Sequence, residues 1–238
     1  MLDKHQQQKI FNKIYGDLQS AEKLKSSAVR EFYERRVLEI GLDGLESSRL
    51  RCLDLGCGRG IFTRLLNKRF RFVIGTDFAL QAVLTAKRIV RRDSVVFLSS
   101  DANFLPFSKD SVDFIVIKDF IHHLDEPSKV LKEIHRILKP GGTLLSVEPN
   151  NRNFTGQIIG RLLEHERQYI ENSPRFLIRL VEHFGFRLIR FAFDGFYVPY
   201  GPFSRIHECA LPFLALFEKI MKVLYPSGGG HFIACYRK

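Results

Sequence analysis

Three glycines at every second position give this chain its clearest chemical signal. Gly56, Gly58 and Gly60 stand in the sequence "LDLGCGRG". Glycine adopts positive φ angles easily, and it lets a ligand approach the main chain without meeting a Cβ atom. The third glycine of a dinucleotide-binding GxGxxG pattern would fall at Ile61, so a close seat for a pyrophosphate is disfavoured. The loop therefore predicts a ligand that is held close to the backbone and is not a dinucleotide.

Three acidic residues stand at equivalent places, each in or just after a short apolar run. Asp54 lies beside the glycines, Asp77 follows about twenty residues after them, and Asp101 ends the next run. A carboxylate beside the loop repels phosphate but attracts a cationic or hydrogen-bond-donating ligand. Asp77 can accept both hydroxyls of a ribose. Three acids without a phosphate-binding lysine predict a site for a positively charged nucleoside, which is the chemistry of S-adenosylmethionine.

A parallel sheet would bring these residues together. Apolar runs alternate with helical stretches after Leu50, which is typical of βαβ units, and ligands bind beyond the carboxyl ends of the strands in such sheets. The predicted strands are 51–56, 70–77, 95–101, 111–119 and 143–150, and the predicted helices are 62–69, 78–92 and 126–138, the last stopped by "KPGG".

The flanking parts have a different pattern. Residues 1–45 have a helical pattern. A second helical stretch follows residue 153, and then come a strand at 186–193, a segment rich in Pro, Gly and aromatic residues, another helix and a final strand at 231–238. We therefore divide the chain into an N-terminal helical segment (1–46), a cofactor-binding core (47–153) and acceptor-side helices with the last two strands of the same domain (154–238).

Four successive motifs carry a family resemblance. The sequences "LDLGCGRG", "GTDF", "SSDANFLPFSKDSVDFIVIKDFIHHL" and "ILKPGGTLLSVEPN" resemble, in order and spacing, those of class I S-adenosylmethionine-dependent methyltransferases of the type 11 group, which includes the ubiquinone/menaquinone C-methyltransferases. The resemblance covers roughly Leu53 to Asn150. It implies an α/β fold: a doubly wound, seven-stranded, mostly parallel Rossmann-like sheet in the order 3-2-1-4-5-7-6, with the last strand antiparallel, N-terminal helices and a helical insertion or lid in the C-terminal half.

The resemblance also implies roles for particular residues. The glycine loop and its neighbours would hold the amino-acid end of the cofactor, and Asp77 would bind the ribose. The residues of this first group are Asp54, Gly56, Cys57, Gly58 and Gly60.

A second implied group surrounds the adenine and the methionine portion. Phe78 would lie against the adenine, Asp101 would accept from its amino group, and Ala102 would donate a backbone N–H to the ring. Lys118 falls where the family lines the methionine portion, usually with a small or uncharged residue.

Each of these residues also has a purely structural interpretation. Asp54 could cap the turn or the following helix, Asp77 could be an N-cap, and Asp101 could be a turn residue. Cys57 is better explained as a small packing residue than as a nucleophile. Lys118 could be exposed or salt-bridged.

Two histidines are candidates for acid–base chemistry. His122 and His123 lie in "KDFIHHLDEP", beyond the fourth predicted strand. A general base is needed only if the acceptor must lose a proton, and a histidine at this place could also be structural. We expect no metal site, because Cys52, Cys57, Cys209 and Cys235 form no ligand pattern.

Information on the acceptor must come from the C-terminal part. Eight aromatic residues lie between Phe184 and Phe203. About half fit a packed strand, whereas "FYVPYGPF" (196–203), with two prolines and a glycine, is a candidate acceptor-pocket loop. The apolar segment 209–225 is too short and too charged to span a bilayer. We expect a lid or cover helix there, with contact to a membrane surface as the alternative.

The overall charge is compatible with several partners. The formal net charge is +11, but residues 1–150 carry +6 and residues 151–238 carry +5, so no basic domain stands out. The densest cluster, Lys87 to Arg92, falls at a predicted helix end, where cations interact favourably with the helix dipole. Nucleic acid is therefore disfavoured as a partner, and the oligomeric state stays open.

The N-terminus lacks a secretory pattern and the cysteines suggest reduced thiols, so we expect a cytoplasmic protein.

The predicted function is methyl transfer from S-adenosylmethionine to a C, O or N atom of a hydrophobic small molecule of quinone, isoprenoid, polyketide or lipid-like type. An RNA methyltransferase is one alternative, suggested by the pI near 9.6; against it, "KDFI" stands where an NPPY-type tetrapeptide would follow the fourth strand. A non-catalytic S-adenosylmethionine-binding partner protein is the other. A dehydrogenase is the weakest interpretation, since the third dinucleotide glycine is missing.

Overall fold

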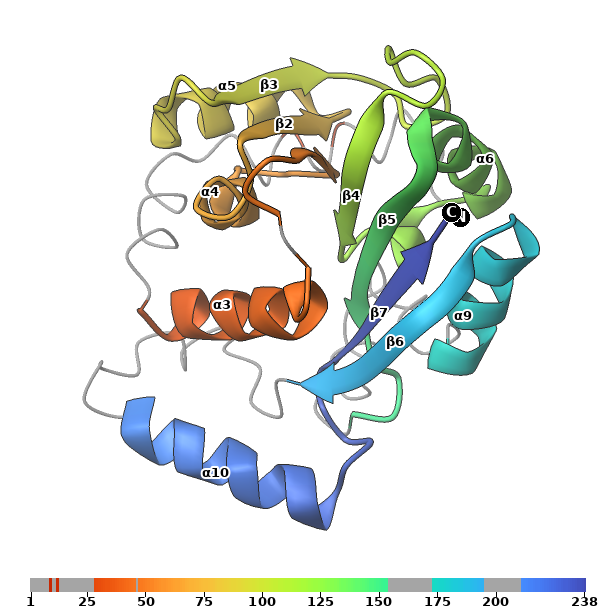
Figure 1. Cartoon of the computed structure of the whole chain (residues 1–238). Helices are drawn as coiled ribbons and strands as arrows, with labels where there is room; N and C mark the ends of the chain where they lie inside the picture. Colours follow the sequence, from red (N-terminus) through yellow and green to blue (C-terminus); the bar gives the residue numbers. More distant parts are fainter. Residues whose placement is uncertain (1–8, 10–11, 13–27, 46, 154–172, 195–210) are drawn as a thin grey trace.

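Seven strands form one sheet in the order β3-β2-β1-β4-β5-β7-β6, in a computed structural model that describes residues 9, 12, 28–45, 47–153, 173–194 and 211–238 (Figure 1). All pairs are parallel except those of β7, which runs antiparallel to both neighbours. This confirms the predicted fold class, strand order and antiparallel last strand. The strands are β1 (Arg51–Leu55), β2 (Phe72–Asp77), β3 (Val95–Ser99), β4 (Val112–Lys118), β5 (Leu138–Pro149), β6 (Arg187–Asp194) and β7 (His231–Arg237).

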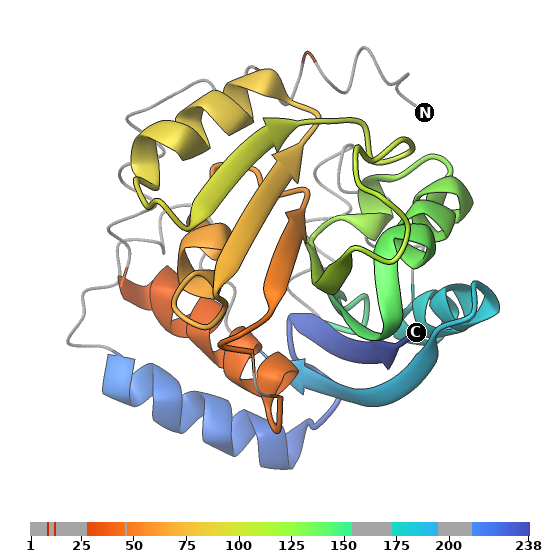
Figure 2. The same cartoon turned by 45° about the horizontal axis from the view of Figure 1, so that its top comes forward.

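Helices cover both faces of this sheet (Figures 1 and 2). Within the described ranges they are α3 (Ala28–Leu42), α4 (Ile61–Leu66), α5 (Leu80–Ile89), the short 3₁₀ helix η1 (Ile121–His123), α6 (Pro127–Ile137), α9 (Pro174–His183) and α10 (Leu211–Leu224). Lys87 and Arg88 lie in the last turn of α5, which supports the interpretation of the basic cluster as a helix end.

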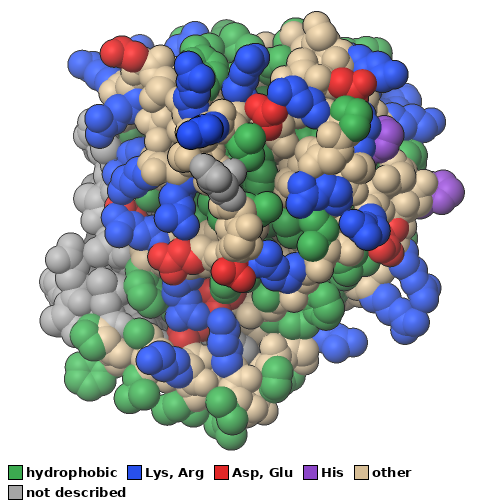
Figure 3. Space-filling model, viewed as in Figure 1, with side chains coloured by type: hydrophobic (Ala, Val, Ile, Leu, Met, Phe, Trp, Pro, Cys, Tyr) green, Lys and Arg blue, Asp and Glu red, His purple; other side chains and the backbone are tan. Residues whose placement is uncertain are grey.

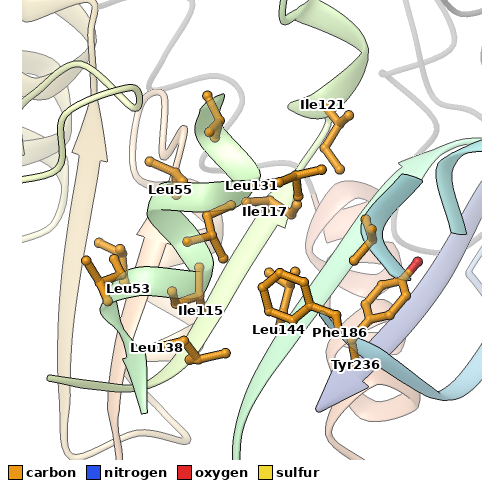
Figure 4. Packing of buried hydrophobic residues seen from close by; sticks show 14 of the residues in the cluster. Leu53, Leu55, Ile115, Ile117, Ile121, Leu131, Leu138, Leu144, Phe186 and Tyr236 are labelled. Atoms are coloured by element: carbon orange, nitrogen blue, oxygen red, sulfur yellow. The ribbon is translucent and has the colours of Figure 1, made fainter. Parts of the chain in front are cut away.

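Alternate residues of the central strands face opposite sides of the sheet, so each strand contributes to two cores. On one face, Leu53 and Ile115 pack with side chains of α6 and α9; Figure 4 shows this cluster. On the other face, Cys52 and Phe114 pack with side chains of α3 and α4. Strands buried on both faces read as continuous apolar runs, which is why the sequence pattern identified them.

Strand β5 begins five residues earlier than the predicted start at Thr143, because its first part pairs separately from the rest. Leu138 pairs with Val112 of β4, and regular pairing resumes only at Thr143 with Phe114. The backbone of Gly141 and Gly142 is bonded to that of Lys238, which holds "KPGG" in the sheet. Helix α6 therefore ends at Ile137, just before "KPGG" as predicted, but the two glycines lie inside an irregular strand rather than in a free turn.

A layer of charged and polar side chains joins α3 to the C-terminal part. Arg36 donates two hydrogen bonds to the carboxylate of Asp194, at 3.1 and 2.6 Å, and Asp194 is fully buried at the end of β6. The Nζ of Lys222 lies 2.9 Å from the same carboxylate. Helix α10 is thus fixed to α3 and β6 by ion pairs.

Several sequence predictions fall outside the described residues. These are most of the N-terminal helical segment, the stretch 154–172, the candidate acceptor loop 196–203 and Cys209. Within the described ranges, none of the helices combines the length and the apolar character needed to cross a bilayer.

Candidate functional site

The glycine loop connects the end of β1 to α4 and depends on glycine at both ends. Gly56 and Gly60 have φ angles of +79° and +72°. A Cβ atom on Gly56 would lie 2.4 Å from the ring of Phe120, and one on Gly60 would lie 2.9 Å from Phe97. The amides of Gly56 and Cys57 donate to the carbonyl of Thr76 in β2, at 2.8 and 2.9 Å. The loop is therefore held against the ends of β2 and β4 at the carboxyl edge of the sheet.

The carboxylate of Asp77 is bonded directly to this loop. Its Oδ2 accepts from the amide of Gly58 at 2.9 Å, and its Oδ1 accepts from the amide of Ala79 at the same distance. Burial raises the pKa of Asp77, opposed by these backbone donors. Ala79, and not Asp77, is the N-cap of α5, so the interpretation of Asp77 as an N-cap is wrong, and its role toward a ribose stays a prediction. Each oxygen retains a second lone pair with which it can accept a hydrogen bond from a hydroxyl group.

Asp54 lies in β1, just before the loop, and is buried. Its Oδ2 accepts from the hydroxyl of Thr63 in α4 at 2.5 Å. Burial raises the pKa of Asp54 to about 7, and the carboxylates of Glu34 and Asp77 push in the same direction against the Thr63 bond. A cationic ligand nearby would favour the ionised form of Asp54.

This pKa leads to a prediction about ligand binding. If the cofactor's cationic end lies near Asp54, S-adenosylmethionine binding should release a proton near pH 6.5 and strengthen roughly tenfold between about pH 6 and pH 8. Affinity rises with pH because Asp54 of the free protein keeps its proton up to about pH 7, whereas Asp54 of the complex loses the proton at a lower pH. Calorimetry in two buffers of different ionisation enthalpy measures the protons released.

Asp54→Asn is the matched control, because it keeps the shape of the side chain but cannot titrate. Its affinity should be lower and independent of pH over the same range. Equal pH dependence in both proteins would show that another group, such as the ligand's own amine, causes the effect.

Cys57 belongs to the packing of α5 rather than to a reactive site. Its side chain is buried in a cluster with Val83 and Phe97. Burial raises the pKa of this thiol well above its ordinary value, with Asp77 and Asp54 adding to the shift. A protonated, enclosed thiol is a poor nucleophile, which supports the interpretation of Cys57 as a packing residue.

The third acid follows β3 and takes part in a local turn. Asp101 Oδ1 accepts from both the backbone amide and the side-chain amide of Asn103, each at 3.0 Å. The amide of neighbouring Ser100 donates to the carbonyl of Asp77 at 3.0 Å, so Asp101 stands at the same sheet edge. Phe78 and Ala102 are half-buried there. The turn role is present, and a role toward adenine remains a prediction.

Lys118 ends β4 in a network of charges. Its Nζ lies 2.5 Å from Asp119 Oδ2 and 3.6 Å from Glu34 Oε1 of α3. Asp119 also contacts His231 Nε2 at 3.2 Å. Burial works against ionisation of Asp119, but Lys118 and His231 together hold its pKa well below the ordinary value. The salt-bridged interpretation of Lys118 is thus present in the structure, and its contact with a cofactor is still a prediction.

The two histidines lie in η1, which a buried glutamate holds in place by hydrogen bonds. Glu148 of β5 is fully buried, and its Oε2 lies 2.7 Å from His122 Nδ1. Its Oε1 accepts from the amides of Phe120 and Ile121, at 3.2 and 2.8 Å. A carboxylate at Nδ1 favours the tautomer with the proton on that nitrogen. Glu148 therefore fixes both the backbone of η1 and the orientation of the His122 ring.

His123 differs from His122 in exposure. The two rings lie with centroids 3.9 Å apart, but His122 is buried whereas His123 is half-buried. Burial suits His122 to a positioning role. His123 is the more exposed of the two, and a role for it as a general base stays a prediction.

Sequence reasoning missed several residues of this edge. Glu148, Glu34, Thr63 and His231 all bond to predicted site residues or their neighbours. Only Glu148 carried a local signal, as an acid at the end of an apolar strand.

The comparisons with known proteins agree with this geometry. Residues 53–146 match the family model described as "Methyltransferase domain". The demethylmenaquinone methyltransferase of Lactococcus lactis is 32% identical over 152 residues, which cover 60% of this chain and 58% of the relative. That of Renibacterium salmoninarum is 34% identical over 104 residues, which cover 44% of this chain and 43% of the relative. The chain thus spans about half the length of these two relatives.

A solved structure extends the likeness to almost the whole fold. A S-adenosylmethionine-dependent methyltransferase of Thermotoga maritima aligns with a TM-score of 0.67, covering 96% of this chain and 98% of that one. The sequence identity is 21%, so this match shows the fold alone.

Proposed function

We propose that this chain, whose residues 53–146 match the family model described as "Methyltransferase domain", transfers a methyl group from S-adenosylmethionine to a hydrophobic small molecule. The observation that carries the proposal is the bond between Asp77 and the Gly58 amide, with buried Asp54 just before the same loop. This arrangement offers carboxylates to ribose hydroxyls and to a positive charge. It offers no third glycine on which a pyrophosphate could sit.

The residues present fit this cofactor. The two acids match a ribose and a cationic amine: both oxygens of Asp77 keep a lone pair beyond their backbone bonds, and the carboxylate of Asp54 lies in β1 next to the glycine loop. In this proposal, Asp77 binds the ribose, the glycine loop and Asp54 hold the amino-acid end, and Phe78, Asp101 and Ala102 surround the adenine. When bound, S-adenosylmethionine supplies a methyl group on a positively charged sulfur, which an acceptor atom displaces in line.

The protein's own contribution is positioning and exclusion of water. Glu148 holds η1 in place, and in this proposal η1, which follows β4 at the carboxyl edge of the sheet, presents His123 to the acceptor. A half-buried imidazole there can take a proton from an acceptor hydroxyl or from the carbon that has gained the methyl group. We assign this role to His123 and a positioning role to His122.

The acceptor in this proposal is quinone-like. Both relatives named above are demethylmenaquinone methyltransferases, and the aromatic stretch after Phe184 supports an apolar acceptor. Phe186 is in the core, whereas Phe191 is half exposed on β6. The relatives' names give no support to the RNA alternative or to a non-catalytic partner. We place the reaction in the cytoplasm, because the three described cysteines are free thiols.

The direct test uses a reduced demethylmenaquinone with a short prenyl chain. We expect a methylated product by mass spectrometry and equal formation of S-adenosylhomocysteine. Tight S-adenosylmethionine binding without product would contradict the quinone assignment but leave the cofactor assignment intact.

Replacement of each histidine by alanine tests the general base. We expect His123→Ala to lower kcat by roughly a hundredfold with little change in KM for S-adenosylmethionine, because proton transfer contributes about 10²–10⁴-fold. His122→Ala should mainly lower stability. If both variants turn over the true acceptor at the wild-type rate, neither histidine is a base.

A further inference from the structure

Helix α10 turns Glu218 and part of Lys222 toward the protein. Glu218 is fully buried and accepts from the hydroxyl of Tyr33 in α3 at 2.9 Å. One turn further on, the Lys222 ammonium reaches Asp194 at the end of β6. These contacts fix the rotation of the helix about its axis. The face opposite Glu218 and Lys222 must therefore point away from the protein.

That outward face is apolar, the reverse of an ordinary surface helix. Phe213 and Val223 are 75% and 80% exposed. The exposed apolar residues recur every three or four positions, which places them in one stripe. They are Phe213, Leu216, Phe217, Ile220, Val223 and Leu224. Figure 3 shows hydrophobic side chains gathered along the lower edge of the molecule, where Figure 1 draws α10. A contiguous exposed apolar stripe of this kind marks a contact surface.

The exposed charge beside this stripe is positive. Glu218 is the one acid in the sequence 211–230, and it is buried. Lys219 is exposed, and Lys222 keeps 39% of its side chain exposed. Beyond the helix, the Tyr225 hydroxyl donates to the carbonyl of exposed Arg152 at 3.1 Å, which brings another cation to the same end.

This combination fits an anionic lipid surface better than a second copy of the chain. Apolar side chains flanked by lysines are the pattern of helices that lie in the membrane interface, where lysine ammonium groups meet lipid phosphates. A second copy would instead bring together two like-charged faces of a protein with a net charge of +11.

The stripe also lies near the edge of the sheet that carries the candidate site. Strand β6 runs parallel to β4, so Asp194 ends at the same edge as Lys118. His231 links the two, since it pairs with Asp194 in the sheet and contacts Asp119. We propose that the outward stripe of α10 docks on an anionic lipid bilayer and turns this edge of the protein toward the membrane.

Vesicle co-sedimentation tests the proposal without cofactor or acceptor, so its result is independent of the proposed function. We expect the wild-type chain to sediment with mixed phosphatidylcholine–phosphatidylglycerol vesicles, less with pure phosphatidylcholine, and less at high salt. Phe213→Ser combined with Val223→Ser should weaken the partition coefficient roughly tenfold or more, because two exposed apolar side chains no longer enter the interface. Lys219→Glu should weaken only the binding to anionic vesicles.

Phe176→Ser is the matched control, since Phe176 is an exposed aromatic of α9, which covers the face of the sheet opposite the one that α3 covers. It should bind vesicles like the wild type. Circular dichroism confirms that the α10 variants are folded. The proposal is overturned if the wild-type chain stays in the supernatant, if the α10 and α9 variants bind equally, or if light scattering finds a dimer that the α10 variants dissociate while no variant changes sedimentation.

Discussion

Asp77→Ala is expected to weaken S-adenosylmethionine binding by at least roughly a hundredfold. Two hydrogen bonds from ribose hydroxyls to a carboxylate contribute about 1.5–3 kcal/mol each, and about 1.4 kcal/mol corresponds to a factor of ten. The variant also removes the acceptor of the Gly58 amide, so the loop loses its link to β2 at this point. Isothermal titration with S-adenosylmethionine measures the effect, and thermal melting separates it from unfolding.

Asp43→Ala is the control for this experiment. Asp43 is a strongly exposed acid that pairs with Arg190, away from the glycine loop. We expect the Asp43→Ala variant to bind S-adenosylmethionine with the wild-type affinity. Asp77→Asn provides a second test, because its amide keeps the size of the side chain but places an N–H or a weaker acceptor against Gly58. Wild-type affinity in both Asp77 variants would remove the ribose assignment.

Glu148→Ala is expected to lower the free energy of unfolding by about 3 kcal/mol or more, because each buried donor left without its acceptor costs about 1–3 kcal/mol. The change leaves two backbone N–H groups and the His122 ring without the carboxylate that they contact. Glu148→Gln keeps an acceptor for the backbone groups and should lose less. Urea denaturation at neutral pH measures the free energy of unfolding of the wild type, Glu148→Ala and Glu148→Gln.

The matched control for Glu148 is Glu126→Ala. Glu126 is an exposed partner of Lys129, and surface pairs of this kind contribute about 0–1 kcal/mol. Its midpoint in urea should stay close to that of the wild type. If Glu148→Ala unfolds at the same urea concentration as Glu126→Ala, η1 is held by other contacts and the positioning role is wrong.

The sequence was sufficient to predict the sheet because the central strands are buried on both faces. Runs such as "FIVIK" in β4 have no exposed side on which polar residues could interrupt them, and the helices between them show the helical period. The first part of β5 could not be predicted, because Leu138 to Gly142 are held by β4 and the distant Lys238, which local patterns do not report.

The candidate site was predictable only in part, for the same reason. Asp54 and Asp77 lie at the carboxyl ends of β1 and β2, and the glycines and Asp101 come shortly after their strands, so their common edge follows from parallel pairing. The pairs Lys118–Glu34 and His122–Glu148 join residues from different elements, and no spacing predicts them. Glu148 was the exception that could have been found, because an acid in a central strand needs a buried partner.

Transfer of label from methyl-labelled S-adenosylmethionine tests the central claim most directly. The purified chain is incubated with the labelled cofactor and a lysate of its own source, and organic-soluble material, RNA, protein and small aqueous metabolites are then separated. We expect label in the organic-soluble fraction, which the Asp77→Ala variant should fail to produce. Label in RNA, or no transfer despite tight binding of the cofactor, would contradict a hydrophobic small-molecule acceptor.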